Sequence, residues 1–124
     1  MRKIKFRGKT IDERKWVYGS LVCNFTATFY IVDEQGEKYN IISKTAGQYA
    51  GLKDCNDEEI YEGDIIKSHI LDNLFLVKYE NGCFGAEYIP EEIIGYPLSI
   101  LTNIEIIGNQ YENPELLEEE NNHG

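Results

Sequence analysis

The sequence FLVKYENGCFGAEY, residues 75–88, contains the clearest local signal for a fold in this chain. Asn81-Gly82 favours a two-residue type I′ turn, because both central positions of that turn need positive φ. A turn at this pair places Glu80 opposite Cys83 and fixes the register of the two strands. One face of the hairpin is then apolar and the other mainly polar, as a half-buried hairpin requires. We expect the apolar face, which pairs Tyr79 with Phe84, Val77 with Ala86 and Phe75 with Tyr88, to point to the core.

A second hairpin is predicted from TFYIVDEQGEKYNII, residues 28–42. Its tip suits a type I turn followed by Gly36 in the left-handed region, which pairs Asp33 with Glu37. On one face, this register places Ile31 opposite Tyr39 and Phe29 opposite Ile41.

A third hairpin is predicted at the N-terminal side, where residues 4–8 and 15–22 flank the polar turn Thr10–Arg14. Phe6, Trp16 and Tyr18 are its aromatic anchors. We expect them to form the inward face of the hairpin. An alternative is that they stack unpaired bases, because basic residues lie beside them.

The rest of the chain gives weaker signals. Residues 43–64 combine three glycines with a dense acidic cluster and have no sustained period, so we expect loops with one short helical turn. Strands are expected over 65–71 and 102–108, and a helical turn over 91–94. Asn113-Pro114-Glu115 is a good helix start, with an Asn cap and Pro in the first position. Leu116 and Leu117 could dock that helix, and residues 118–124 are expected to fray.

These signals predict a mainly β, hairpin-rich chain, hence a β-sandwich or a small barrel with a short C-terminal helix. The 124 residues suit one compact domain or two small units, and the nine Tyr among them favour strands. The net charge of −10 is uneven. Residues 1–16 hold seven basic and two acidic groups, a local charge of +5, so the remainder carries −15. Such a field repels phosphate backbones at a distance, so nucleic-acid binding would need the basic N-terminal hairpin as a local patch.

The three cysteines, Cys23, Cys55 and Cys83, form no C-x-x-C pair, and the histidines are His69 and His123. Local spacing therefore assembles no zinc site. We expect three reduced thiols, buried as small hydrophobes, in a reducing cytoplasm. No apolar run approaches the length of a membrane span, so we expect no membrane association.

Catalytic motifs are lacking in the sequence. A calcium loop of the EF-hand type begun at Asp54 would need Gly at its sixth position and Glu at its twelfth, where Glu59 and Ile65 stand. His69 lies within a strand pattern without a recognisable nucleophile beside it. No nucleophile-elbow, Walker-type or dinucleotide-binding glycine pattern occurs. We therefore predict no enzyme, no catalytic residues, no metal and no cofactor.

The central string TAGQYAGLKD, residues 45–54, followed by EIYEGDIIK, residues 59–67, resembles the signature of the YopX-like family of phage and prophage proteins. The opening IKFR, the VYGSL at 17–21, the Asn81-Gly82 hairpin and the closing segments IIGN and NPELL are also similar to that family. Asp57 stands where the family usually has a turn glycine, and Cys55 replaces what is commonly a charged residue.

This resemblance implies a small barrel of the Src-homology-3 (SH3) type from about Gln48 onward, preceded by a β-rich N-terminal unit. The expected organisation is an N-terminal β-rich unit over 1–47, the barrel over 48–111, and a short helix with an acidic tail over 112–124. The resemblance also implies a phage-type protein of the host bacterial cytoplasm. It implies no activity, because the family has none established.

The leading functional hypothesis is a non-enzymatic interaction module that binds a host or phage protein or a second copy of itself. Tyr49, Lys53, Asp54, Tyr61 and Glu62 are the candidate binding residues, because the loop over 48–64 combines aromatic anchors with carboxylates and amides. Alternatively, the basic N-terminal end neutralises this loop, which would make it scaffold. A second hypothesis is nucleic-acid binding by the basic hairpin, and an enzyme acting on nucleotides or cell wall has the weakest support.

Overall fold

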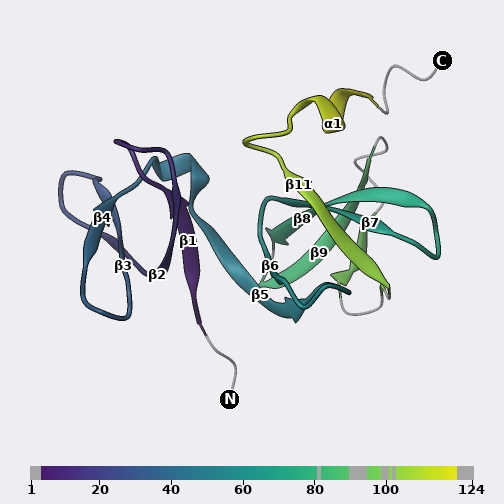
Figure 1. Cartoon of the computed structure of the whole chain (residues 1–124), viewed down its shortest axis with the longest axis horizontal. Helices are drawn as coiled ribbons and strands as arrows, with labels where there is room; N and C mark the ends of the chain where they lie inside the picture. Colours follow the sequence, from purple (N-terminus) through teal and green to yellow (C-terminus); the bar gives the residue numbers. More distant parts are fainter. Residues whose placement is uncertain (1–3, 81, 90–94, 99–100, 102, 120–124) are drawn as a thin grey trace. The chain divides into compact units, whose positions relative to one another are not determined.

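The computed structural model describes residues 4–80, 82–89, 95–98, 101 and 103–119, and its strands make the chain mainly β (Figure 1). The chain divides into two units, Met1–Tyr49 and Ala50–Gly124. The sequence-based boundaries 1–47, 48–111 and 112–124 stay predictions. Within the described part of the chain, no helix is long and apolar enough to cross a membrane.

Unit 1 is an antiparallel sheet with the strand order β4-β3-β2-β1-β5. Its elements are β1 (Phe6–Lys9), β2 (Trp16–Cys23), β3 (Phe29–Val32), β4 (Lys38–Asn40), the 3₁₀ turn η1 (Ser43–Thr45) and the start of β5 (Gly47–Lys53). The core of this unit forms on one face of the sheet around Val17, Ile31 and Ile41.

The hairpin β1–β2 has the predicted turn but not the predicted inward face. Val17 pairs with Gly8 and points to the core of unit 1, where Phe6 also packs. Trp16 and Tyr18 flank Val17 in the strand, so the alternation of side chains puts both on the opposite face. The expectation that they line the core was wrong, because one residue of register decides the face.

The hairpin β3–β4 has the predicted register. Ile31 pairs with Tyr39, and the N–H of Asp33 donates to the carbonyl of Glu37 at 3.0 Å. Gly36 has a φ of 86°, and its N–H donates to the carbonyl of Asp33 at 3.0 Å. A type I turn closed by a left-handed glycine is therefore confirmed.

Unit 2 contains an antiparallel sheet with the order β10-β9-β8-β7-β11, and the end of β5 neighbours β6. Its elements are β6 (Glu59–Tyr61), β7 (Asp64–Ser68), β8 (Asn73–Glu80), β9 (Cys83–Ile89), β10 (Gly95–Pro97), β11 (Ile104–Asn109) and the helix α1 (Glu115–Glu119). In the described residues β10 and β11 are the two edges of this sheet, so it is open. The SH3-type barrel expected over 48–111 is not confirmed.

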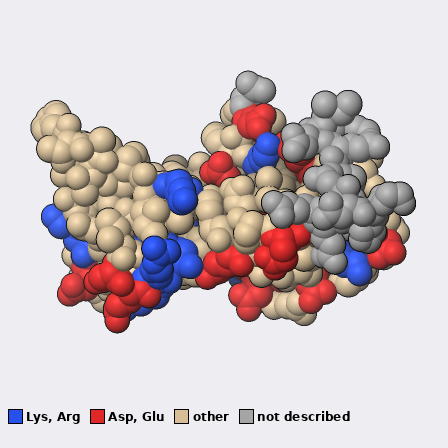
Figure 2. All heavy atoms as spheres, turned by 90° about the horizontal axis from the view of Figure 1, so that it is seen from above, with Lys and Arg blue, Asp and Glu red and all other residues tan. Residues whose placement is uncertain are grey.

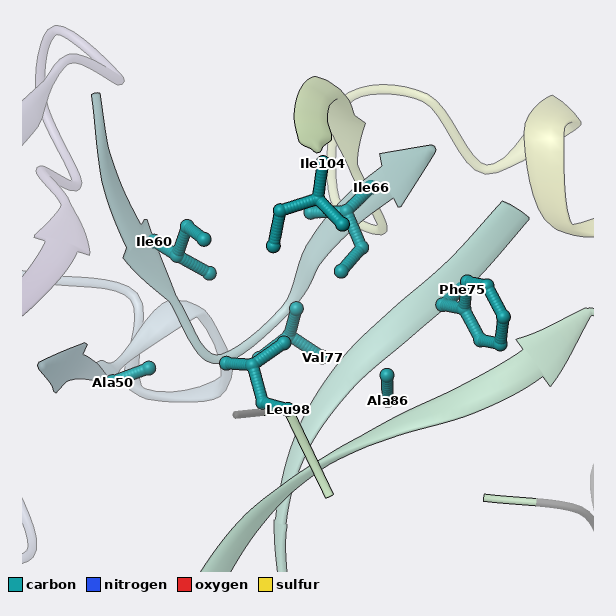
Figure 3. Packing of buried hydrophobic residues seen from close by; sticks show 8 residues of the cluster. All are labelled: Ala50, Ile60, Ile66, Phe75, Val77, Ala86, Leu98 and Ile104. Carbon is teal, nitrogen blue, oxygen red and sulfur yellow. The ribbon is translucent and has the colours of Figure 1, made fainter. Parts of the chain in front are cut away.

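The β8–β9 hairpin pairs as predicted, with Glu80 opposite Cys83 and Phe75 opposite Tyr88. Gly82 has a φ of 81°, as the turn requires, and Asn81 lies outside the described residues. The middle of the apolar face is fully buried. Figure 3 shows its side chains pointing into the main core, which comprises Ala50, Ile60, Ile66, Phe75, Val77, Ala86, Leu98 and Ile104. Tyr79, at the open end of that face, is 40% exposed.

The opposite face of the hairpin is less polar than predicted. Leu76 is buried there in a second cluster with Ile65 and Ile89, and Leu116 and Leu117 of α1 pack against that cluster. The predicted docking of the helix is therefore confirmed. It explains why a leucine occupies the face that otherwise carries Lys78 and Glu87.

Other differences concern segments whose partners are distant in sequence. Residues 43–64, expected to be loops with one short helical turn, contain the 3₁₀ turn η1 but also the strands β5 and β6. The strand expected over 65–71 ends at Ser68, and the last strand runs over Ile104–Asn109. All three cysteines are free but exposed rather than buried, since each lies at a strand end or in a turn. The helical turn expected over 91–94 lies outside the described residues.

Candidate interaction surfaces

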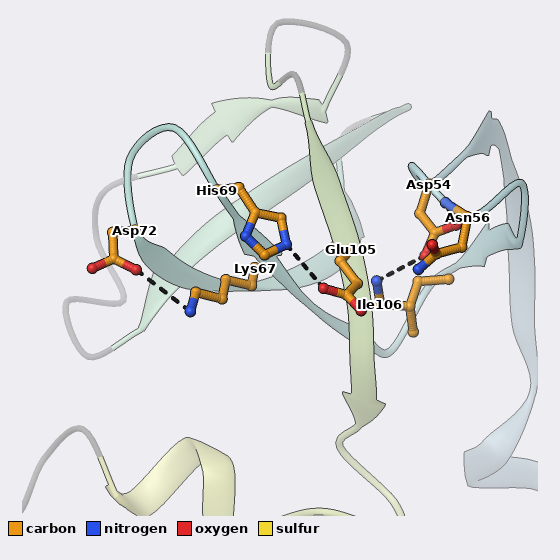
Figure 4. A network of polar contacts seen from close by, with 7 residues as sticks. All are labelled: Asp54, Asn56, Lys67, His69, Asp72, Glu105 and Ile106. Carbon is orange, nitrogen blue, oxygen red and sulfur yellow. Dashed lines mark hydrogen bonds and ion pairs between the residues drawn. The ribbon is translucent and has the colours of Figure 1, made fainter.

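The turn between β5 and β6 is organised by one carboxylate, that of Asp54, which is only 8% exposed. Its Oδ1 accepts the N–H groups of Asn56 and Glu58, both at 2.9 Å. Its Oδ2 accepts the N–H of Ile106 in β11 at 3.0 Å (Figure 4). A carboxylate that accepts three backbone N–H groups fixes the turn and ties it to a strand 52 residues away. Asp54, predicted as a binding residue, therefore holds the site together from inside.

The side chains around Asp54 point outward. Leu52 and Lys53 at the end of β5 are exposed, as are Cys55, Asn56, Asp57 and Glu58 in the turn. Lys53 Nζ lies 3.7 Å from Asp57 Oδ1, and both side chains are about half exposed or more. The braced turn thus presents one apolar, one basic and two acidic side chains beside Cys55 and Asn56.

The structure separates the five predicted binding residues by role. Tyr61 is buried, donates its N–H to Asp64 Oδ2 at 2.8 Å and donates its hydroxyl to Glu59 Oε1 at 3.0 Å. Glu62 follows it and is half-buried. Tyr49 is buried at the end of unit 1, where its N–H donates to the carbonyl of Lys5 at 2.7 Å. Lys53 is the exposed member of the set.

A second polar group lies on β7, on the turn between β7 and β8, and on β11 (Figure 4). His69 Nε2 is 2.9 Å from Glu105 Oε1, and Lys67 Nζ is 3.4 Å from Asp72 Oδ1. These are surface pairs of a kind that usually adds little stability. Among the described residues, no group of three or more His, Cys, Asp or Glu side chains is placed to hold a metal ion.

Basic residues in β1 and just before it lie against aromatic rings. The Arg7 guanidinium is 4.4 Å and the Lys9 ammonium 5.8 Å from the centre of the Trp16 ring. The Lys5 ammonium lies 5.6 Å from the centre of the Tyr49 ring. Such cation–π contacts are worth about 0.5–2 kcal/mol each. The face of unit 1 opposite its core is therefore basic and aromatic.

The two units differ strongly in charge. Residues 1–49 hold nine basic and five acidic groups, a net charge of +4, and residues 50–124 hold three and seventeen, a net charge of −14. Charge is also uneven within unit 1. Figure 2 shows an extended surface of that unit, at the left of the view, without Lys, Arg, Asp or Glu.

Three turns share one construction, and only for the middle one did the sequence predict the turn type and register. They are the Asn24 turn (24–28), the Asp33 turn (33–37) and the Asp54 turn (54–58). In each, the side-chain oxygen of the first residue accepts the N–H of the third and fifth residues at 2.9–3.0 Å. In each, the fourth residue has positive φ: Ala27 at 61°, Gly36 at 86° and Asp57 at 66°. An Asn or Asp followed by a left-handed residue three positions later is the shared signal.

These observations define a mainly β protein of two antiparallel units with rigid, side-chain-capped turns. Residues 5–118 match the family model described as YopX protein, and the chain belongs to that family. The crystal structure of protein EF1440 from Enterococcus faecalis is similar in fold, with a TM-score of 0.64 and 24% sequence identity. That similarity covers 95% of this chain and 100% of the other. No curated protein matches the chain.

Proposed function

We propose that this chain is a non-enzymatic protein-interaction module that binds a partner protein through the Asp54 turn. The observation that carries the proposal is the set of three backbone N–H groups accepted by the buried Asp54 carboxylate. These three hydrogen bonds fix the backbone of the Asp54 turn in the unbound protein. A preorganised surface loses little conformational entropy on binding, which raises affinity for the same contacts.

The chemistry of the exposed side chains favours a protein as the partner. Leu52 offers an apolar contact, and Lys53, Asp57 and Glu58 place both signs of charge around it. Mixed charges around an apolar centre select a complementary protein surface and a single orientation on it. A phosphate backbone, by contrast, offers one sign of charge only.

The family resemblance supports three finer proposals about the same protein. These are a phage or prophage origin, the cytoplasm of a bacterial host as the place of action, and an SH3-type arrangement of unit 2. The partner is then a host protein, another phage protein or a second copy of the chain.

The test reverses one exposed charge at the site. We expect Lys53→Glu to weaken binding of a purified partner by about tenfold or more, because a fixed like charge then faces the surface that Lys53 fits. Lys44→Glu is the matched control, since Lys44 is an exposed residue of η1 and the change in net charge is the same. Partners are found by quantitative mass spectrometry of proteins retained by wild type and by each variant.

Two results decide the proposal. A protein that wild type and Lys44→Glu bind equally, and that Lys53→Glu binds more weakly, supports it. Equal retention of every protein by all three forms contradicts it. Sedimentation of the purified chain shows whether the partner is a second copy, because Lys53→Glu would then also dissociate the oligomer.

The basic and aromatic face of unit 1 supports a second candidate function, nucleic-acid binding. Lys9 and Trp16 are partly exposed and Tyr18 is exposed on one face of the sheet, a pattern suited to phosphates and stacked bases, whereas Arg7 on the same face is buried. A gel shift across a salt series tests it. Binding through phosphates must weaken steeply as salt rises and must fall in Lys9→Ala, and no shift at low salt removes this candidate.

A further inference from the structure

The Asn24 turn, which joins β2 to β3, satisfies its own polar groups. Asn24 Oδ1 accepts the N–H of Thr26, the N–H of Thr28 and the Thr26 hydroxyl at 2.8–3.0 Å. Asn24 Nδ2 donates to the Tyr30 hydroxyl at 3.2 Å, and the Thr26 and Thr28 hydroxyls lie 3.0 Å apart. Because these groups are already bonded to one another, the turn is rigid and its backbone does not need a partner.

Two residues of this turn are of types that are unusual at their positions in a turn. Phe25 stands at the tip with a relative exposure of 110%, so the ring makes almost no contact with the rest of the protein. Ala27 adopts a φ of 61°, in the left-handed region that is unfavourable for an L-residue with a Cβ. The Asp33 and Asp54 turns have Glu34 and Cys55 in place of the phenylalanine. Residues that break the usual residue preferences of a turn, with no gain in stability to compensate, are expected at functional sites.

The hairpin that bears the turn is uncharged. The seventeen residues from Trp16 to Val32 include no Asp, Glu, Lys or Arg, although 27% of the whole chain is charged. Val22, in the strand just before the turn, is also exposed. From β4, the Lys38 ammonium lies 4.7 Å from the centre of the Tyr30 ring and is engaged there. What the tip offers is therefore one aromatic ring on a rigid, uncharged support.

We propose that Phe25 is the anchor of a second binding surface, and that it inserts into an uncharged apolar pocket of a partner protein. This inference rests on the proposed function, since both need a protein partner, but it concerns a different turn in a different unit. An aromatic ring held on a rigid turn enters a pocket at little entropic cost, and burying it removes a large apolar surface from water. Residues of this kind carry much of the affinity of an interface.

Charge favours a protein pocket over a lipid surface. Interfacial binding to membranes usually needs basic side chains beside the apolar ones, because headgroup layers are often anionic. The hairpin supplies none over 16–32, and the chain as a whole carries −10. An uncharged pocket in a folded protein matches an uncharged tip, and a single protruding ring needs a concave receptor rather than a flat one.

The test places a photo-reactive benzoylphenylalanine at position 25 of the full chain, in the cells that naturally make it. The same residue at position 34, in the equivalent place of the Asp33 turn, is the matched control. We expect a protein that is cross-linked from position 25 and not from position 34. With that protein purified, Phe25→Ala should weaken binding by roughly 30-fold or more, as expected of an aromatic hot spot. Phe25→Leu should retain most of the affinity and Glu34→Ala all of it.

Several outcomes overturn the proposal. These are no specific cross-link at position 25, a cross-link only to a second copy of the chain, or an affinity that Phe25→Ala leaves unchanged. Phe25-dependent sedimentation of the chain with phosphatidylcholine vesicles would assign the tip to membranes instead. If Lys53→Glu weakens the partner and Phe25→Ala does not, this inference fails while the proposed function stands. If only Phe25→Ala weakens it, the Asp54 turn is not the binding surface.

Discussion

The Asp54 turn and the Asn24 turn have the same backbone hydrogen bonds and the same side-chain cap, yet they differ in what the cap does. The Asp54 carboxylate is buried, and its second oxygen reaches β11 across 52 residues of sequence. The Asn24 amide is exposed, and its side chain makes hydrogen bonds to Thr26, Thr28 and Tyr30, all close by in sequence. The comparison shows that the same capped turn can either connect distant strands or hold an exposed side chain in place, depending on the residues around it.

The Asp33 turn stands between the two and serves as an internal reference. It is exposed like the Asn24 turn, but its tip carries Glu34 and Gln35 and its left-handed position carries Gly36. The Asp33 turn therefore shows which residues this type of turn carries when it only connects two strands of a hairpin. The aromatic tip and the strained alanine of the Asn24 turn have no counterpart in it.

The largest expected difference between these turns is in the cost of losing the cap. Asp54→Ala should lower the free energy of unfolding by about 2–4 kcal/mol, because partly buried N–H groups lose their acceptor. Asn24→Ala should cost about 1 kcal/mol, since water can reach the N–H groups it leaves. Denaturant unfolding of the two variants measures both. Equal losses would show that burial does not distinguish the two turns.

The left-handed positions should respond in opposite directions to exchanged residues. Gly36→Ala should destabilise by about 1 kcal/mol from backbone conformation alone, because no atom lies within 4 Å of the added methyl group. Ala27→Gly should stabilise by about 0.5–1 kcal/mol, since it removes the same strain. Thermal melts of the pair give both signs. A loss of stability in Ala27→Gly would mean that the alanine methyl group has a structural contact.

Exposed tips should contribute almost nothing to folding. Lys53→Ala and Phe25→Ser should each change the free energy of unfolding by less than about 0.5 kcal/mol. Lys53 loses only a solvent-exposed pair with Asp57, and Phe25 has nearly no contacts to lose. A melting temperature several degrees lower in either variant would identify that residue as scaffold.

The smallest effect is a pH dependence confined to the Asp33 turn. Burial raises the pKa of the Tyr39 hydroxyl above its usual 10.0, and the Asp33 carboxylate, which accepts that hydroxyl at 3.3 Å, raises it further. Because the pKa is higher in the folded state, the protonated hydroxyl contributes stability to the fold. This stabilisation is fully present below the unfolded-state pKa of 10.0 and is lost as the pH rises through the folded-state pKa. NMR titration of labelled tyrosine rings should show Tyr39 ionising late, and Asp33→Asn should bring its pKa down towards 10.0.

The sequence by itself determined the features that depend on neighbours along the chain. The registers of the 28–42 and 75–88 hairpins follow from Gly36 and Gly82, because positive φ at a known position sets which residues face each other. The docking leucines of α1 and the YopX family could also be read from the residues. The hairpin and helix signals each lie within about a dozen residues, and the family signature consists of short motifs in order along the chain.

Only the tertiary structure decided what depends on distant partners. β5 and β6 were hidden because Gly47, Gly51 and a cluster of acids have low strand propensity, and pairing with neighbouring strands overrides it. Nothing near Asp54 in sequence indicates that its carboxylate accepts the N–H of Ile106, so the sequence did not predict that Asp54 braces the turn. The Asn24 turn was missed because Ala27 stands where the turn pattern calls for glycine. The proposed anchor Phe25 is exposed and the brace Asp54 is buried. Whether a side chain is exposed or buried depends on the whole fold, so the sequence of each turn does not reveal it.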